Sequence, residues 1–106
     1  MTELAKLTDR VARVSDVYEK RTGVVRDDDW YALKLQEELG ELIAEHLRLT
    51  GRGRKREQTA VEAETARADE AADLFASLLL YCLHNRIDLE AALERKWFVH
   101  LPVDAL

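Results

Sequence analysis

The chain has 106 residues, of which 47% are hydrophobic and 35% are charged, and its formal net charge at pH 7 is -5. This length predicts a single domain, residues 1–106, and the composition is that of a globular rather than a disordered chain. The negative balance disfavours a general nucleic-acid binder, so we expect no nucleic acid among its partners.

Localisation follows from three features of the chain. The longest apolar run, Leu78 to Leu83, is too short to cross a bilayer. Charged residues such as Glu3 and Lys6 interrupt the first residues, which is not typical of a signal peptide. The single cysteine, Cys82, lies in an apolar run, so it is expected to be a core residue rather than a nucleophile. We therefore expect a cytoplasmic protein without a membrane partner.

Apolar residues recur at spacings of three and four along most of the chain, a period that predicts helices and no strand. The expected helices cover approximately residues 2–22, 30–50, 57–85 and 88–97. Gly23 and Gly51 are stop signals, Asp88 and the triplet Asp27-Asp28-Asp29 are N-cap candidates, and Pro102 is expected to end the regular structure. The predicted fold class is all-α, a four-helix bundle.

The third expected helix is apolar on nearly every side from Leu74 to Leu83. Apolarity all round a helix indicates burial on more than one face. One small domain offers few surfaces for this, so the pattern predicts a subunit interface and a homo-oligomer.

Two groups of acidic residues share helix faces with apolar residues. The first is Glu37, Glu38 and Glu41, and the second is Glu70 and Asp73. At about 100° per residue, Glu38 lies on the border of the apolar arc of its helix, Glu41 lies further round, and Glu37 is outermost. Glu70 projects from the middle of a mostly apolar arc, and Asp73 lies on its edge.

A carboxylate in an apolar arc must be neutralised, paired or bound to metal, because an unpaired buried charge is destabilising. Lys34, Arg48 and Arg67 are available for pairing. Clustered carboxylates need more positive charge than one or two side chains supply, and Mg²⁺ is the first candidate among hard divalent cations. The alternative is a set of surface acids in ordinary pairs with residues four positions away.

Two acidic runs stand 28 residues apart, Glu37-Glu38-Leu39-Gly40-Glu41 and Glu70-Ala71-Ala72-Asp73. Together they resemble the EExxE…ExxD signature of the MazG-like, all-α nucleoside triphosphate pyrophosphohydrolases. Flanking residues agree with the resemblance, which covers about residues 30–97. The gap is toward the long end of the family range, and the basic run Gly51-Arg52-Gly53-Arg54-Lys55-Arg56 fills part of it.

The resemblance implies roles by position. Glu38, Glu41, Glu70 and Asp73 match the residues that hold Mg²⁺, with Mn²⁺ as a substitute, and Glu37 matches a catalytic acid that orients the attacking water. It also implies hydrolysis of a nucleoside triphosphate to the monophosphate and pyrophosphate, and assembly as a homodimer or homotetramer. A housecleaning role in the nucleotide pool follows from the resemblance alone.

Several other side chains are substrate-binding candidates, each with a simpler alternative. Lys34 contacts a phosphate or pairs with an acid. Arg52 and Arg54 contact phosphates or form a solvated loop. Trp30 stacks on a base or belongs to the core. Lys96 matches a family cation near the phosphates or is plain surface.

Other functions are also open at this point. Phosphoribosyl-ATP pyrophosphohydrolase shares the acid pattern and the reaction type. A non-catalytic helical module would use the apolar third helix to bind a partner, with its acids solvated. No Glu-x-x-His and no Walker-type phosphate loop occur in the sequence, which disfavours a di-iron bundle and a P-loop enzyme.

Overall fold

The computed structural model describes residues 1–105. It contains the helices α1 (Glu3–Thr22), α2 (Asp28–Leu49), α3 (Ala60–His84) and α4 (Leu89–Lys96), followed by two 3₁₀ turns, η1 (Phe98–His100) and η2 (Val103–Ala105). No strand occurs between residues 1 and 105. The predicted all-α class is therefore confirmed.

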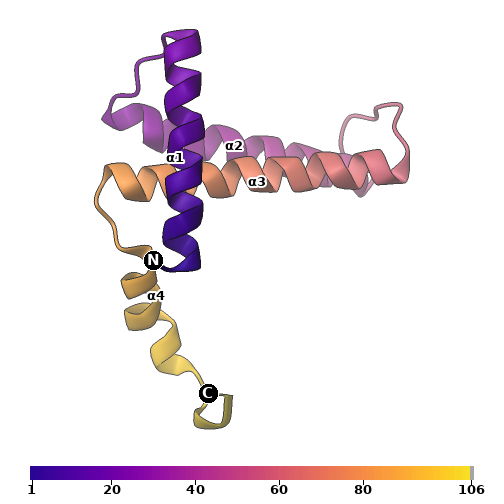
Figure 1. Ribbon diagram of the computed structural model, residues 1–106. Helices are drawn as coiled ribbons and strands as arrows, with labels where there is room; N and C mark the ends of the chain where they lie inside the picture. Colours follow the sequence, from indigo (N-terminus) through magenta and orange to yellow (C-terminus); the bar gives the residue numbers. More distant parts are fainter. Residues whose placement is uncertain (106) are drawn as a thin grey trace.

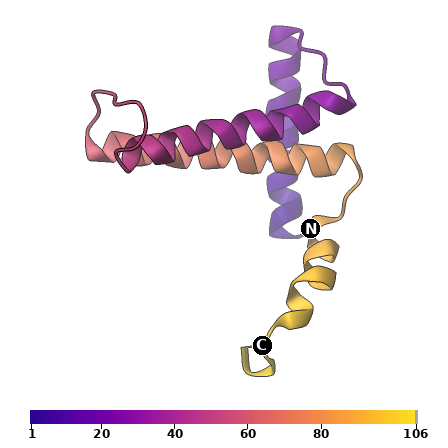
Figure 2. The ribbon, with the colours of Figure 1, turned by 180° about the vertical axis from the view of Figure 1, so that it is seen from behind.

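The helices are arranged as one long antiparallel pair with a crossing helix. α2 and α3 lie side by side along their lengths, α1 crosses the pair over the later part of α3, and α4 turns away from it (Figures 1 and 2). The Cα radius of gyration is 16.8 Å, whereas a compact chain of this size has a radius near 13 Å. The four helices of one chain thus do not pack together as the expected bundle.

Side-chain caps determine where the helices begin. Asp27 accepts a hydrogen bond from the Trp30 backbone N–H at 2.8 Å, so α2 begins at Asp28 rather than Trp30. Thr59 and Glu62 form a reciprocal capping box, so α3 begins at Ala60 and not at the expected Glu57. Asp88 caps α4, as the sequence predicted.

Glycines end the first two helices. Gly23 and Gly51 adopt the left-handed conformation, with φ of 70° and 81°, which glycine reaches without steric cost. α2 ends at Leu49, one residue before the expected end. Regular structure does not stop at Pro102, because the 3₁₀ turn Val103–Ala105 follows it.

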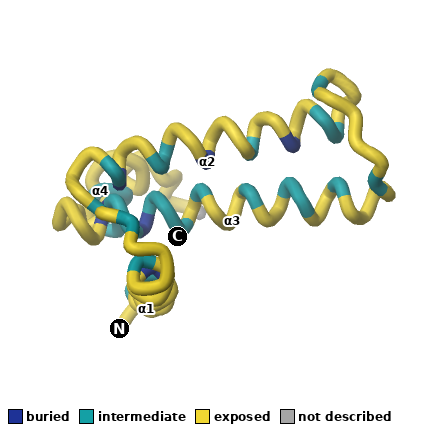
Figure 3. The backbone as a smooth tube through the Cα atoms, turned by 90° about the horizontal axis from the view of Figure 1, so that it is seen from above, coloured by how far each residue is buried: buried dark blue, intermediate teal, exposed yellow. Residues whose placement is uncertain are grey.

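The core of the single chain is small. Among the described residues, only Tyr31, Leu79 and Cys82 are buried hydrophobic side chains (Figure 3), and the burial of Cys82 confirms its predicted place in the core. Phe75 and Leu83, which were expected to be covered on α3, are 45% and 52% exposed. None of the described helices combines the length and the apolarity that a membrane span requires.

Candidate metal centre

The α2–α3 pair brings the two predicted acidic groups together. Glu38 and Glu41 project from α2, and Glu70 and Asp73 project from the facing side of α3. One carboxylate oxygen from each residue lies within 4.8 Å of the other three. Residues three apart share a helix face, so two such pairs on antiparallel neighbours converge on one point. We call these four residues the acidic cluster.

Two members of the acidic cluster are deep and two are at its mouth. Glu38 is 8% exposed, Glu70 is half-buried, and Glu41 and Asp73 are exposed. The Oε2 atoms of Glu38 and Glu70 are both buried without a hydrogen-bond partner. Buried carboxylate oxygens are normally satisfied, and a metal ion bound by the acidic cluster could satisfy these two.

Crowding of the carboxylates changes their proton affinity. Burial, and then the charge of Glu41, raises the pKa of Glu70 to about 7. Burial also raises the pKa of Glu38, and its contact with Lys34 opposes this increase. Burial is the first cause of both increases, and the charge of neighbouring carboxylates is a further cause.

Within the described chain, Lys34 is the cation that forms an ion pair with a member of the acidic cluster. Its Nζ lies 3.3 Å from Glu38 and 3.4 Å from Glu37, which confirms the predicted pairing. Arg48 instead pairs with Glu45, which lies about two helical turns after Glu38 on the same side of α2. One ammonium group against four carboxylates leaves room for a divalent cation with oxygen ligands.

Glu37 stands apart from the four clustered oxygens. Its side chain is 56% exposed and is held by Lys34 at the edge of α2. The structure thus agrees with the angular expectation that Glu37 is the outermost acid of its group. It lies one residue before Glu38 and on the solvent side of the cluster.

An apolar pocket of about 530 Å³ lies between α1 and the helix pair, and Lys34, which contacts Glu38, is among its lining residues. Trp30 and Lys34 line it from α2, and Ser77, one turn after Asp73, lines it from α3. The Lys34 ammonium lies 5.8 Å from the centre of the Trp30 ring. Two of the predicted substrate-binding residues are therefore brought to one pocket beside the acids.

No pattern in the sequence connects α1 with the site, yet α1 forms one wall of this pocket. Its contribution consists of Leu7, Arg10, Val11, Val14, Ser15 and Tyr18. These positions follow an ordinary amphipathic pattern, and the crossing of α1 over α3 is what brings them near Lys34. The one available signal was the exposure of Val14 and Tyr18, 70% and 55%, which only the fold reveals.

Arg52, Arg54 and Lys96 are not brought to the acidic cluster of the same chain. Arg52 and Arg54 belong to the loop after α2, and eight residues of α2 separate Glu41 from Leu49, about 12 Å along the axis. The backbone carbonyl of Arg54 accepts a 2.8 Å hydrogen bond from Arg48. Lys96 is exposed at the end of α4, which runs away from the helix pair (Figure 1).

Comparison of the chain with protein-family models, with curated proteins and with solved structures gives no match. The relation to MazG-like enzymes accordingly depends on the acidic residues and their spacing.

Proposed function

We propose that the protein is a Mg²⁺-dependent nucleoside triphosphate pyrophosphohydrolase. The observation that carries the proposal is the convergence of four carboxylate oxygens within 4.8 Å, two of whose side chains hold a buried oxygen without a partner. A hydrated hard cation suits such a donor set, because carboxylate oxygens are its preferred protein ligands.

Glu38, Glu41, Glu70 and Asp73 would hold the metal, with Mn²⁺ as a substitute for Mg²⁺. When bound, the metal would offset phosphate charge and increase the acidity of a coordinated water. Glu37, exposed beside the cluster, is placed to accept the proton of the attacking water. Lys34, held between Glu37 and Glu38, can turn its ammonium toward a phosphate oxygen.

The pocket beside the acidic cluster is the proposed place of the nucleoside. Trp30 offers an aromatic face for the base, and Lys34 joins the apolar part of the pocket to the acids. The reaction adds water across one phosphoanhydride bond and releases a nucleoside monophosphate and pyrophosphate. Contributions from Arg52, Arg54 or Lys96 would require a second copy of the chain.

Assembly and cellular role complete the proposal. A homodimer or homotetramer is supported by the small core and by the many exposed large side chains, among them Leu39, Ile43 and Phe75. A housecleaning role, removing surplus or non-standard nucleotides, extends the resemblance to MazG-like enzymes. The cytoplasmic location is proposed from the composition, with its single cysteine Cys82.

A panel assay tests the proposal. Purified protein is incubated with Mg²⁺ and each of the common NTPs and dNTPs, and pyrophosphate release is measured. We expect release from at least one substrate and its loss in Glu70→Gln. Phosphoribosyl-ATP is included, because turnover of that compound alone would indicate the related pyrophosphohydrolase instead.

The exposed apolar surface favours a second candidate, a non-catalytic helical module. This reading predicts no pyrophosphate release from any substrate and no effect of Mg²⁺ on the melting temperature. Both results together would refute the hydrolase proposal.

A further inference from the structure

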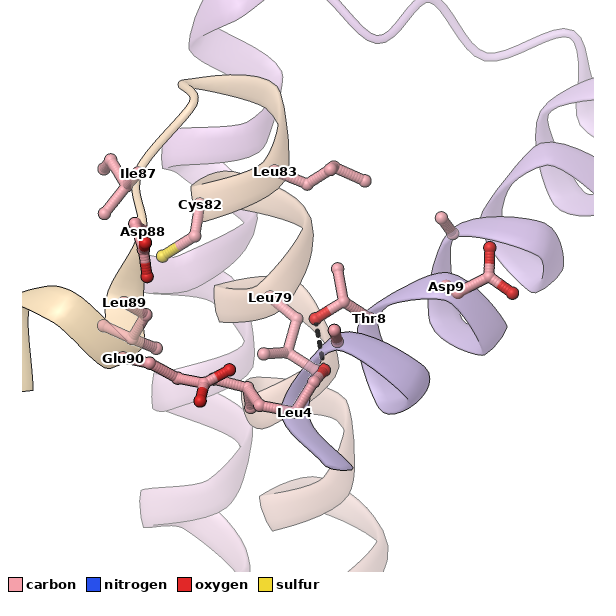
Figure 4. Close-up of a pocket in the computed structure, with 12 residues that line it drawn as sticks. Leu4, Thr8, Asp9, Leu79, Cys82, Leu83, Ile87, Asp88, Leu89 and Glu90 are labelled. Atoms are coloured by element: carbon pink, nitrogen blue, oxygen red, sulfur yellow. Dashed lines mark hydrogen bonds between the residues drawn. The ribbon is translucent and has the colours of Figure 1, made fainter. Parts of the chain in front are cut away.

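A second pocket lies at the junction of α1, the end of α3 and the start of α4, and the proposed hydrolysis makes no use of it (Figure 4). Its volume is about 330 Å³. The apolar part of its lining consists mainly of Leu4, Leu79, Cys82, Leu83, Ile87 and Leu89. We call this cavity the junction pocket.

The rim of the junction pocket is acidic. Asp88 and Glu90 stand on the α4 side, and Asp9, which pairs with Arg13 at 3.1 Å, stands on the α1 side (Figure 4). No lysine or arginine is among the lining residues. Glu90 accepts a hydrogen bond from Thr2. The pocket thus suits a ligand that is apolar in its centre and positively charged at its edge.

The chain itself contains such a segment immediately after the pocket. Residues 95–101, here called the C-terminal arm, carry two formal positive charges on Arg95 and Lys96 and no acid. Trp97 is 65% exposed, Val99 67% and Leu101 45%. Exposed aromatic and aliphatic side chains in one short segment are typical of an interaction site.

A chain's own arm cannot fill its own junction pocket in this fold. α4 starts on the pocket wall at Leu89 and carries the arm away from the rest of the chain (Figures 1 and 2). The eight residues of α4 hold Trp97 about 12 Å from Leu89 along the helix axis. A second copy of the chain can supply the missing side chains.

We propose that two copies of the chain exchange C-terminal arms, each arm packing into the junction pocket of the other. The apolar side chains of the arm cover the pocket floor, and Arg95 lies against the acidic rim. A reciprocal contact of this kind closes with twofold symmetry. The proposal is independent of catalysis, because none of the residues that carry it belongs to the acidic cluster.

The area involved reaches the lower limit for a specific dimer. A fully covered aromatic side chain buries about 150–250 Å², so the exposed part of one arm supplies on the order of 400 Å². Two arms and the two smaller pocket surfaces that they cover give roughly 1,000 Å², the size at which a specific interface begins.

A charge-exchange experiment tests the arms directly. Glu90→Arg makes the pocket rim repel a basic arm, and Arg95→Glu makes the arm repel an acidic rim. We expect the unchanged chain to be dimeric by sedimentation velocity and each variant alone to dissociate at least tenfold more readily. In an equal mixture of the two variants, both exchanged contacts join opposite charges, so the dimer should return.

Circular dichroism of each variant establishes whether the helices are retained. The double variant Trp97→Ala, Phe98→Ala removes apolar side chains without changing the charge, and we expect it to lose the dimer as well. A monomeric unchanged chain would overturn the proposal. So would a dimer that survives the paired alanine substitutions, or a mixture of folded variants that stays monomeric. An unchanged chain that is dimeric but releases no pyrophosphate would contradict the proposed function and leave the arm exchange standing.

Discussion

Replacing Glu70 by Gln should have opposite effects in the absence and in the presence of Mg²⁺. Without metal, the ionised Glu70 carboxylate lies among Glu38, Glu41 and Asp73 and is poorly solvated. The Gln side chain keeps the volume and removes the charge. We therefore expect the variant to be more stable than the unchanged chain without metal and to lose stabilisation by metal.

The magnitude follows from the raised pKa of Glu70, about 7 against an ordinary 4.5. Folding favours the protonated form, so the contribution of Glu70 to stability is complete below about pH 4.5 and is lost as the pH rises through about 7. One pKa unit corresponds to about 1.36 kcal/mol. After reduction for the partial solvent access of the side chain, we expect Glu70→Gln to stabilise the metal-free chain at pH 8 by roughly 1–3 kcal/mol.

Thermal unfolding at pH 5 and pH 8, with EDTA and with Mg²⁺, measures both effects. Saturating Mg²⁺ at 100 times its Kd should stabilise the unchanged chain by about 2.7 kcal/mol and leave Glu70→Gln nearly unaffected. Glu64→Gln is the matched control, because Glu64 is an exposed acid on the same helix outside the acidic cluster. All comparisons are made at one protein concentration.

Two outcomes would refute this reasoning. One is a metal-free Glu70→Gln variant that is no more stable at pH 8 than the unchanged chain. The other is an undiminished response of that variant to Mg²⁺. Either result would mean that Glu70 is not a crowded, metal-binding carboxylate.

Three further predictions concern single positions. Gly40→Ala should stabilise α2 by about 0.5–1 kcal/mol, because an added Cβ meets nothing within 4 Å. Gly53→Ala should destabilise the chain, because its Cβ would lie 2.8 Å from the backbone nitrogen of Arg48. The opposite order of melting temperatures would contradict this. Arg48→Met should cost about 3 kcal/mol in urea unfolding, since it leaves the buried Glu45 without its nearest cation. An unchanged midpoint would show that Arg56, whose guanidinium lies 3.5 Å from the same carboxylate, suffices. Lys34→Met should tighten the binding of Mg²⁺ alone several-fold in calorimetry, because it removes a competing cation 3.3 Å from Glu38. Pyrophosphate release by the same variant should fall. Weaker Mg²⁺ binding would show that Lys34 supports the metal site.

Helices and the acidic cluster were predictable from the sequence because both depend on local periodicity. Glu38 and Glu45 show where this stops. They lie on the same border of the apolar arc of α2 and are equally buried, at 8% exposure. Glu38 faces Glu70 and Asp73, whereas Glu45 is paired by Arg48. The neighbours of Glu38 and Glu45 decide their different roles. The periodicity of one helix does not predict which residues of another helix will lie opposite it.

The position of α1 was not predictable for a related reason. Its pattern specifies an apolar stripe without specifying which helix the stripe will cover or at what angle. The structure places Ser15 in a buried contact with Arg26, whose other partners are Asp16 and Glu19. This network fixes the turn between α1 and α2, and with it the wall of the pocket beside Lys34.

The loop between α2 and α3 holds none of the clustered acids, yet it determines whether they meet. The backbone N–H groups of Arg52 and Gly53 both bond to the Leu47 carbonyl, which fixes the point where the chain reverses. The clustered oxygens lie within 4.8 Å of one another, and a shift of α3 by one turn is about 5.4 Å. An insertion or deletion in this loop that moved α3 by one turn would separate the two acidic groups, so the proposed metal site could be lost without substitution of any of the four acids.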